Sequence, residues 1–220
     1  MVVILYRITR TKQPSGANKD THTWPAYKTA FHKARMSITM QGKPCISVDP
    51  FARNCRWAKY RNDIDEDTEA EYHMDAIQFL SKIHDDVGLV DLILFDPPYS
   101  QRQTEEKYGQ IANVYTTPGY VKDIFEIMVK MLSHRGRIIK LGYNSTRHSD
   151  CLELVDMEVL NFGGNRNDVI MTTWERTSKN WRDYNENDRL CVNPVLVYVD
   201  DTGEDIYECG GCWVCEGEEE

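Results

Sequence analysis

Residues 89–100 read LVDLILFDPPYS. The near-continuous apolar run at 89–95 has the length of a strand and is typical of a parallel strand that is buried on both faces. Asp96 follows, and Pro97-Pro98 then end the strand because proline cannot donate a ladder hydrogen bond. Open parallel sheets bind ligands at the carboxyl ends of their strands. The stretch therefore predicts a central strand with a candidate functional loop directly after it.

Strand and helix patterns alternate on both sides of this strand. The expected strands are 2–8, 44–51, 56–63, 71–75, 137–142, 153–161 and 168–175, and the expected helices are 25–40, 76–84 and 120–134. Gly163-Gly164-Asn165 separates the last two strands, which is a hairpin-type signal. The order predicts an α/β fold with a mainly parallel sheet and a reversed edge strand.

Length and charge suggest three segments. The 220 residues fit one α/β domain with a modest appendage. Residues 1–43 hold eight Lys or Arg and one acid, whereas residues 200–220 hold nine acids and no base. We expect a basic N-terminal arm at 1–43, a domain at 44–190 and an acidic, cysteine-containing tail at 191–220. The net charge of −9 argues against a protein that binds nucleic acid with its whole surface. A basic arm can still contact phosphates. The competing interpretation is that both charged ends are merely exposed to solvent.

Location is inferred from hydropathy and cysteine usage. The sequence has no run of eighteen apolar residues, and the apolar stretch near residue 1 is too short for a secretory signal. The first four cysteines are scattered, as a reducing compartment tolerates: Cys45, Cys55, Cys151 and Cys191. We therefore expect a cytoplasmic protein.

The loop after the central strand, Asp96-Pro97-Pro98-Tyr99, resembles the DPPY signature of amino-group methyltransferases, especially the adenine-specific DNA enzymes. The resemblance covers about residues 44–175 and implies a Rossmann-like S-adenosylmethionine-dependent methyltransferase fold. A looser likeness to small phage-encoded adenine methyltransferases rests on the segments VDPFARN, NDI and DPPYS. It implies a phage origin, with the host cytoplasm as the location and DNA as the partner.

The resemblance implies a role for each catalytic-loop residue. The adenine amino group is a poor nucleophile because its lone pair is delocalised, and two acceptors aimed at its hydrogens can free that lone pair. Asp96 and the carbonyl of Pro97 are the expected acceptors, and Pro98 helps to stiffen the loop. Tyr99 offers a face on which the flipped target base can stack. The N6 amine then attacks the sulfonium methyl group directly, without a covalent enzyme intermediate or a catalytic metal.

The expected cofactor loop follows the first strand of the domain. Asp49 and Phe51 match the acid and the phenylalanine of the family's loop. The family's two glycines are replaced here by Ala52 and Asn54, although glycine permits close approach of backbone to ligand. This departure puts the detailed cofactor contacts in question.

Two further acids resemble the family's cofactor ligands. Asp63 matches the acid that accepts hydrogen bonds from both ribose hydroxyls, and Ile64 is expected to cover the cofactor's adenine ring. For the neighbouring Asp65, a charged loop residue is an equally good interpretation. Asp75 matches the acid that accepts from the cofactor's adenine amino group, while it is also a helix N-cap candidate for residues 76–84.

Nucleic-acid contacts are expected after the catalytic loop. Residues 100–118 form a long polar and aromatic segment, in which Arg102 and Lys107 are candidate phosphate contacts. A plain loop is the competing interpretation. No target-recognition domain of the usual size fits between or after the motifs, so this loop and residues 1–43 are left to provide specificity.

A metal hypothesis rests on Cys209, Cys212 and Cys215. The Cys-x-x-Cys spacing with intervening glycines can wrap a structural Zn²⁺ ion. Three thiolates need a fourth ligand, and Cys191 is the nearest cysteine. The alternative is an acidic tail with incidental cysteines.

Three rival functions share the same motif. The first is an RNA amino-group methyltransferase of the ribosomal type, and the second is a cytosine-amino DNA enzyme, which more often has Ser in place of Asp96. The third is a catalytically inactive nucleic-acid-binding protein derived from a methyltransferase, which the missing glycines favour.

Overall fold

The computed structural model describes residues 5–10, 21–40, 42, 44–98, 119–161, 168–177, 195–199 and 205–208. In chain order its elements are β1 (Leu5–Arg10), the short 3-10 helix η1 (Thr21–Thr23), α1 (Pro25–Thr39), β2 (Ser47–Asp49), β3 (Tyr60–Arg61), α2 (Ala76–Val87), β4 (Val90–Phe95), α4 (Tyr120–Met131), β5 (Leu132–Gly142), β6 (Leu152–Asn161), β7 (Val169–Arg176), β8 (Val195–Val199) and β9 (Asp205–Glu208). β8 and β9 pair with each other as a separate antiparallel ribbon.

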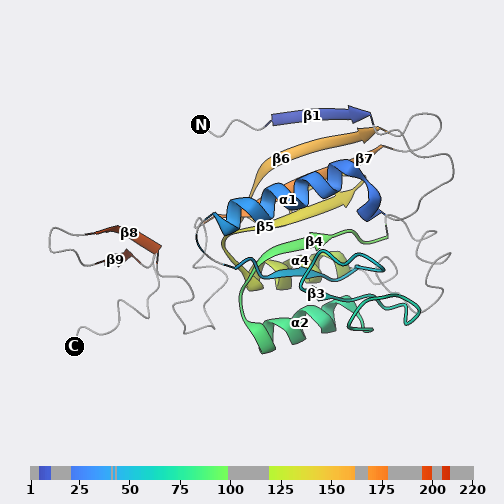
Figure 1. The fold of residues 1–220 in the computed structure, drawn as a ribbon, viewed down its shortest axis with the longest axis horizontal. Coiled ribbons are helices and arrows are strands. Elements are labelled where there is room, and N and C mark those ends of the chain that lie inside the picture. The colour runs from blue at the N-terminus through green and yellow to red at the C-terminus, as the bar shows by residue number, and fades with distance from the viewer. Residues whose placement is uncertain are drawn as a thin grey trace.

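A seven-stranded sheet forms the centre of the fold, in the order β1-β6-β7-β5-β4-β2-β3 (Figure 1). β7 runs antiparallel to both of its neighbours, and every other pairing is parallel. The expected Rossmann-like α/β class, mainly parallel with one reversed strand, is confirmed. The reversed strand is not at the edge, however, because β6 and then β1 continue the sheet beyond it. The strand order changes direction between β2 and β4, which is where such sheets bind ligands.

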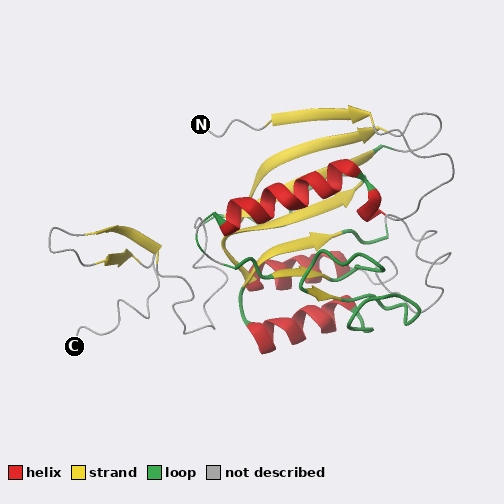
Figure 2. Ribbon diagram, viewed as in Figure 1, coloured by secondary structure: helices red, strands yellow, loops and turns green. Residues whose placement is uncertain are grey.

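Helix α1 covers one face of the sheet (Figure 2). Pro25 begins the helix, where its missing N–H is not needed. Its buried residues follow one another at spacings of four, three and four, and they pack on the sheet together with side chains of β4 and β5: Tyr27, Phe31, Ala34 and Ile38. The described part of residues 1–43 therefore belongs to the sheet domain, because α1 covers it and β1 extends it. The expected boundary at residue 43 does not separate two structural units.

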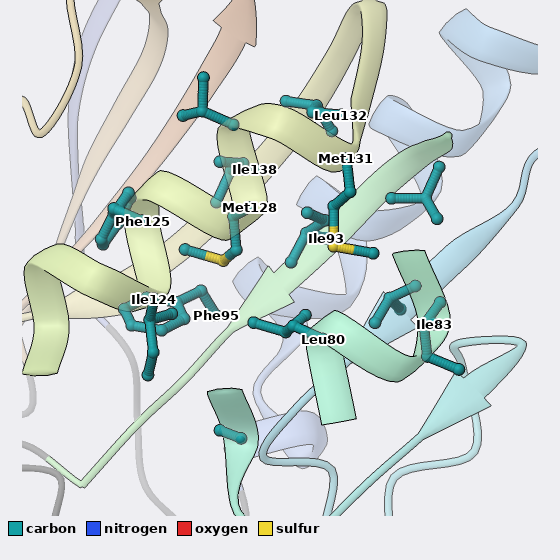
Figure 3. Close-up of a cluster of buried hydrophobic side chains, with 14 of the residues drawn as sticks. Leu80, Ile83, Ile93, Phe95, Ile124, Phe125, Met128, Met131, Leu132 and Ile138 are labelled. Atoms are coloured by element: carbon teal, nitrogen blue, oxygen red, sulfur yellow. The ribbon is translucent and has the colours of Figure 1, made fainter. Parts of the chain in front are cut away.

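Helices α2 and α4 cover the opposite face. Their apolar sides pack with β4 and β5 into the larger core cluster, part of which Figure 3 shows. Asp75 begins α2 by accepting a hydrogen bond from the backbone N–H of Ile77 (2.9 Å), and Gly88 ends it with a φ of 80°. Helix α4 was expected to reach residue 134, but it ends at Met131 and β5 begins at the next residue.

Several expected strands are shorter in the structure. β2 and β3 occupy only the centres of the ranges 44–51 and 56–63, and the range 71–75 contributes a single bridge between Tyr72 and Asn62. The reason is that backbone groups around them bond to side chains and turns, as described below. Among the described residues, no helix combines the length and the hydrophobicity that crossing a bilayer requires.

Candidate functional site

The residues expected to act together lie after neighbouring parallel strands. Asp49 is the last residue of β2, Asp63 follows β3, and Asp96 follows β4. Because β3, β2 and β4 are adjacent and parallel, their carboxyl ends share one edge of the sheet (Figure 1). This edge includes the switch point between β2 and β4. The sheet thus brings together the two loops for which cofactor and catalytic roles were expected.

Asp49 is a buried acid, with 3% of its surface exposed. Its Oδ1 accepts a hydrogen bond from the backbone N–H of Phe51 (3.0 Å). Burial raises the pKa of Asp49 well above its ordinary value, and the nearby Asp96 and Asp63 raise it further. The ionised form of Asp49 is therefore costly at this position unless a cation joins it.

The glycine-free loop after β2 uses an arginine where a glycine would be expected. Arg53 has a φ of 47°, in the left-handed region. The carboxylate of Asp63 accepts a hydrogen bond from the Arg53 backbone N–H at 3.1 Å and so holds this conformation. Ala52 is buried, and its N–H donates to the carbonyl of Asn62 at 2.8 Å. The loop reaches a glycine-like bend through contacts from the loop after β3.

Asp63 is buried and joins the loop after β2 to the loop after β3. Only 1% of its surface is exposed, and its second oxygen accepts from the N–H of Asp65 at 3.0 Å. Burial raises the pKa of Asp63, although these two backbone hydrogen bonds oppose the shift. Asp65 and Ile64 are half-buried, so they are the residues of this segment that can meet a ligand at its surface.

Asn62 joins three segments of the site, which its sequence pattern did not reveal. Its side-chain amide donates to the carbonyls of Pro50 (3.1 Å) and Met74 (3.0 Å), and its oxygen accepts from the N–H of Met74 (3.1 Å). The side chain is 1% exposed and all of these bonds are made. A short polar residue after a strand is the signal, but its partners lie twelve residues away in both directions.

Asp75 already has two partners in the structure. One oxygen caps α2, and the other accepts a hydrogen bond from the hydroxyl of Tyr120 at 2.5 Å. Burial, together with this bond, raises the pKa of Tyr120, which therefore stays protonated and donates. The helix-cap interpretation of Asp75 is confirmed. A cofactor contact at the same carboxylate would share an oxygen with Tyr120 or with the cap.

Aromatic rings connect the cofactor loop to the core. The half-buried Phe51 meets Phe95 edge-on, with ring centroids 5.7 Å apart, and Phe95 meets Phe125 in the same way at 5.0 Å. Figure 3 shows Phe95 and Phe125 beside each other within the cluster between β4 and α4. This row fixes the position of β4 immediately before Asp96.

Asp96 is half-buried and stands at the end of this row. The hydroxyl of Thr21, in η1, donates to its Oδ2 across 75 residues of sequence. Pro97 and Pro98 are both buried, so the loop leaves β4 on a fixed path. Tyr99 lies outside the described residues. Thr21 was missed in the sequence because it stands in a polar stretch without any pattern.

Tyr27 and Trp57 are two neighbouring aromatic residues, one on α1 and one in the segment between β2 and β3. Tyr27 is 2% exposed, and its buried hydroxyl has no hydrogen-bond partner among the described residues. Burial raises the pKa of Tyr27, and the charges of Asp49 and Asp96 add to the effect. The Trp57 ring lies 5.6 Å from that of Tyr27. In the sequence, only the helical spacing of the apolar residues in α1 indicated that Tyr27 is buried.

Other expected site residues lie outside the described part of the chain. These are Arg102, Lys107, Cys209, Cys212 and Cys215. Within the described ranges, no group of three or more His, Cys, Asp or Glu side chains is arranged to hold a metal ion. The zinc and phosphate hypotheses remain predictions.

Comparison with known proteins gives no match among family models or curated proteins. Solved structures that resemble the chain include the N-methyltransferase NodS from Bradyrhizobium japonicum WM9 in complex with S-adenosyl-L-homocysteine, at 13% identity, covering 73% of this chain and 93% of that one, with a TM-score of 0.44. TrmN from Thermus thermophilus gives 14% identity, 73% and 51% coverage, and a TM-score of 0.44. A putative methyltransferase, yhhF, from Escherichia coli gives 12% identity, coverage of 75% of this chain and 89% of that one, and a TM-score of 0.43. The chain's own strand order and connections show a Rossmann-like α/β fold.

Proposed function

We propose that the protein transfers a methyl group from S-adenosylmethionine to the exocyclic N6 amino group of adenine in DNA. The observation that carries this proposal is the Asp96-Pro97-Pro98-Tyr99 sequence directly after β4, beside the switch point of the sheet. The half-buried carboxylate of Asp96 stands there, and its charge contributes to the raised pKa of Asp49 at the end of β2. A motif and a ligand-binding position therefore coincide.

The charge of the site fits a cationic methyl donor. Asp49 and Asp63 are almost completely buried, and Asp96 raises the pKa of Asp49 through its negative charge. When bound, S-adenosylmethionine supplies an activated methyl group on a positively charged sulfur. Asp49, Phe51 and the surface of Ile64 and Asp65 are the residues proposed to hold it. A cation placed among these acids lowers the cost of burying them.

Asp96 is proposed to orient the target amine. The Asp96 carboxylate, whose Oδ2 accepts from Thr21, is proposed to accept a hydrogen bond from the adenine amino group. The carbonyl of Pro97 is the proposed second acceptor. Two fixed acceptors act mainly by positioning and electrostatic preorganisation, because neither has to move during the reaction. The adenine would be flipped out of the duplex to reach them.

The proposal is tested by methyl transfer from labelled cofactor. Duplex DNA, ribosomal RNA and an adenine-free duplex made of G·C pairs alone are incubated with the protein, and the modified nucleosides are identified by mass spectrometry. N6-methyladenine in the duplex is the expected product. Methylated guanine in ribosomal RNA would favour the RNA amino-group enzyme, and modified cytosine in duplex DNA would favour the cytosine-amino enzyme.

A non-catalytic nucleic-acid-binding protein is the second candidate. It is favoured by the absence of glycines after β2 and by Asp75, whose two oxygens already have partners. This candidate predicts no heat of binding when S-adenosylmethionine is titrated into the protein. The proposed enzyme binds the cofactor, and Asp63→Ala weakens that binding because the Arg53 bend loses its support.

A further inference from the structure

A buried lysine lies beside β4, on the face of the sheet opposite α1. Lys140 of β5 is paired in register with Phe95, the residue before Asp96, and it is 6% exposed. Its ammonium lies 5.9 Å from the centre of the Phe125 ring on α4. Burial lowers the pKa of Lys140 to about 8, so the group is still mainly charged at pH 7.

The polar partners of this ammonium are neutral groups. Lys140 Nζ donates to Oδ1 of Asn144 at 3.0 Å and lies 3.2 Å from Nε2 of His148. Burial, with the charge of Lys140, lowers the pKa of His148 to about 4, so the imidazole is neutral at pH 7. The His148 ring stacks on Phe125 with centroids 3.9 Å apart and an interplanar angle of 18°, which fixes its plane.

The hydrogen bonds of Lys140 fix which atoms of Asn144 and His148 accept and which are left to donate. An ammonium only donates, so Nε2 of His148 must accept, and the single ring hydrogen then resides on Nδ1. The same argument applies to Asn144, whose Oδ1 accepts from Lys140 and from the N–H of Thr146 at 3.3 Å. Its amide nitrogen, which carries two donors, therefore points away from Lys140.

Both donors occur on the segment after β5, which is exposed at residues 143–147 and half-buried at His148. Asn144 is exposed, and Tyr143 beside it is 46% exposed. β5 is the parallel neighbour of β4, so the segment leaves the same edge of the sheet as the catalytic loop. An aromatic surface beside N–H donors matches the chemistry of a nucleobase, which offers a π face together with ring nitrogen and carbonyl acceptors.

We propose that Lys140 is a positioning residue that turns the Asn144 amide and the His148 Nδ1–H outward, as a recognition site for nucleobase acceptors beside Asp96. This inference rests on the proposed function for its ligand. The arrangement of the donors is a property of the protein alone and is testable without a ligand.

The first experiment reads the tautomer of His148 by ¹⁵N NMR of the free protein at pH 7. The Nδ1–H form is expected in the unmodified protein. In Lys140→Met, which keeps an apolar chain over Phe125, the Nε2–H form becomes populated and the pKa of His148 rises. A dominant Nε2–H form in the unmodified protein would overturn the inference, whatever the protein's activity.

The second experiment compares Asn144→Asp with Ser145→Asp. Asn144→Asp keeps the acceptor for Lys140 but removes both amide donors, while Ser145→Asp adds the same charge one residue away on the exposed segment. Binding of a fluorescent adenine-containing duplex is measured with S-adenosylhomocysteine present. We expect Asn144→Asp to weaken binding about tenfold, as for loss of a hydrogen bond to a ligand, and Ser145→Asp about threefold or less.

Equal losses in the two variants would show that charge alone matters and would overturn the inference. If the unmodified protein methylates DNA while the variants bind equally, the proposed function stands and this inference fails. If the unmodified protein neither binds nor methylates nucleic acid, the proposed function fails together with the recognition role. The NMR result then still decides whether Lys140 keeps the ring hydrogen of His148 on Nδ1.

Discussion

At the residue scale, the site is a group of acids whose burial raises the pKa values of Asp49 and Asp63. Asp49 and Asp63 are buried, and Asp96 adds to the raised pKa of Asp49. The sequence predicted where these acids stand, because each lies at the end of a strand or shortly after it. It could not predict the partners of Asp63 and Asp96, since the N–H of Arg53 and the hydroxyl of Thr21 meet them only through folding. No periodicity in a sequence records such contacts.

Asp96→Ala is predicted to separate chemistry from cofactor binding. The substitution removes an acceptor proposed for the target amine, so kcat should fall by at least about 100-fold, as when a preorganised hydrogen-bonding group is removed from an active site. The dissociation constant of S-adenosylmethionine, measured by calorimetry, should change less than about threefold, because Asp96 is not among the proposed cofactor ligands. Retained turnover would count against the mechanism.

Asp49→Asn is predicted to stabilise the free protein at neutral pH and to weaken cofactor binding. The folded-state pKa of Asp49 is raised, so the folded state holds its proton more tightly than the unfolded state does. The acid therefore costs stability as pH rises above its unfolded pKa of about 3.9. Asn keeps an oxygen for the Phe51 N–H without the charge.

The measurement is thermal unfolding of both proteins between pH 4 and pH 7. The melting temperature of the variant should exceed that of the parent at pH 7, by about 2–4 °C for each kcal/mol gained, and the difference should shrink toward pH 4. Asp85→Asn, at an exposed position on α2, is the control and should show no such trend. A destabilised Asp49→Asn protein at pH 7 would refute the assignment of a buried, costly charge.

At the element scale, the clearest sequence patterns gave the most accurate elements. The apolar run of β4 and the one-sided pattern of α4 matched the structure within a few residues, because burial of a whole strand or helix face leaves a periodic record. β2 and β3 are short, since their neighbours bond to side chains such as Asn62 instead of to a ladder. The role of α1 was underestimated, because only its packing on β4 and β5 shows that it covers one face of the sheet.

Phe31→Ala tests whether α1 is part of the domain. Phe31 is 1% exposed and stacks on Trp57 with centroids 5.3 Å apart. Removing the ring leaves a cavity between α1 and the sheet, and the free energy of unfolding should fall by about 3–5 kcal/mol in urea denaturation. Lys33→Ala, exposed on the same helix, should change it by less than about 0.5 kcal/mol. Similar small effects in both variants would indicate a detached arm.

At the scale of the whole molecule, charge is distributed unevenly over an acidic chain. The net charge is −9, yet α1 contains no acid and exposes basic side chains: Lys28, Lys33 and Arg35. Thr21, just before this helix, contacts Asp96, so α1 begins next to the proposed target site. Three of the eight Lys and Arg residues of 1–43 are thus carried by α1, a helix of the domain. It is the surface that we expect to meet phosphates.

Lys28→Ala with Arg35→Ala is predicted to weaken duplex binding mainly at low salt. For every phosphate that the protein no longer neutralises, the slope of log K against log salt should become shallower by about 1. The matched control is Lys122→Ala with Lys130→Ala on α4, which covers the other face of the sheet and should leave the slope unchanged. Fluorescence anisotropy over a salt series measures both pairs. A larger change in the α4 pair would place the nucleic acid on the opposite face.

The central claim is that an adenine amine is methylated beside Asp96. The most direct test is sequencing, with a method that detects modified adenine, of DNA from cells that express either the protein or its Asp96→Ala variant. The account predicts N6-methyladenine at a recurring short sequence with the unmodified protein and none with the variant. Unmodified adenine in both, despite folded protein that binds S-adenosylmethionine, would contradict it.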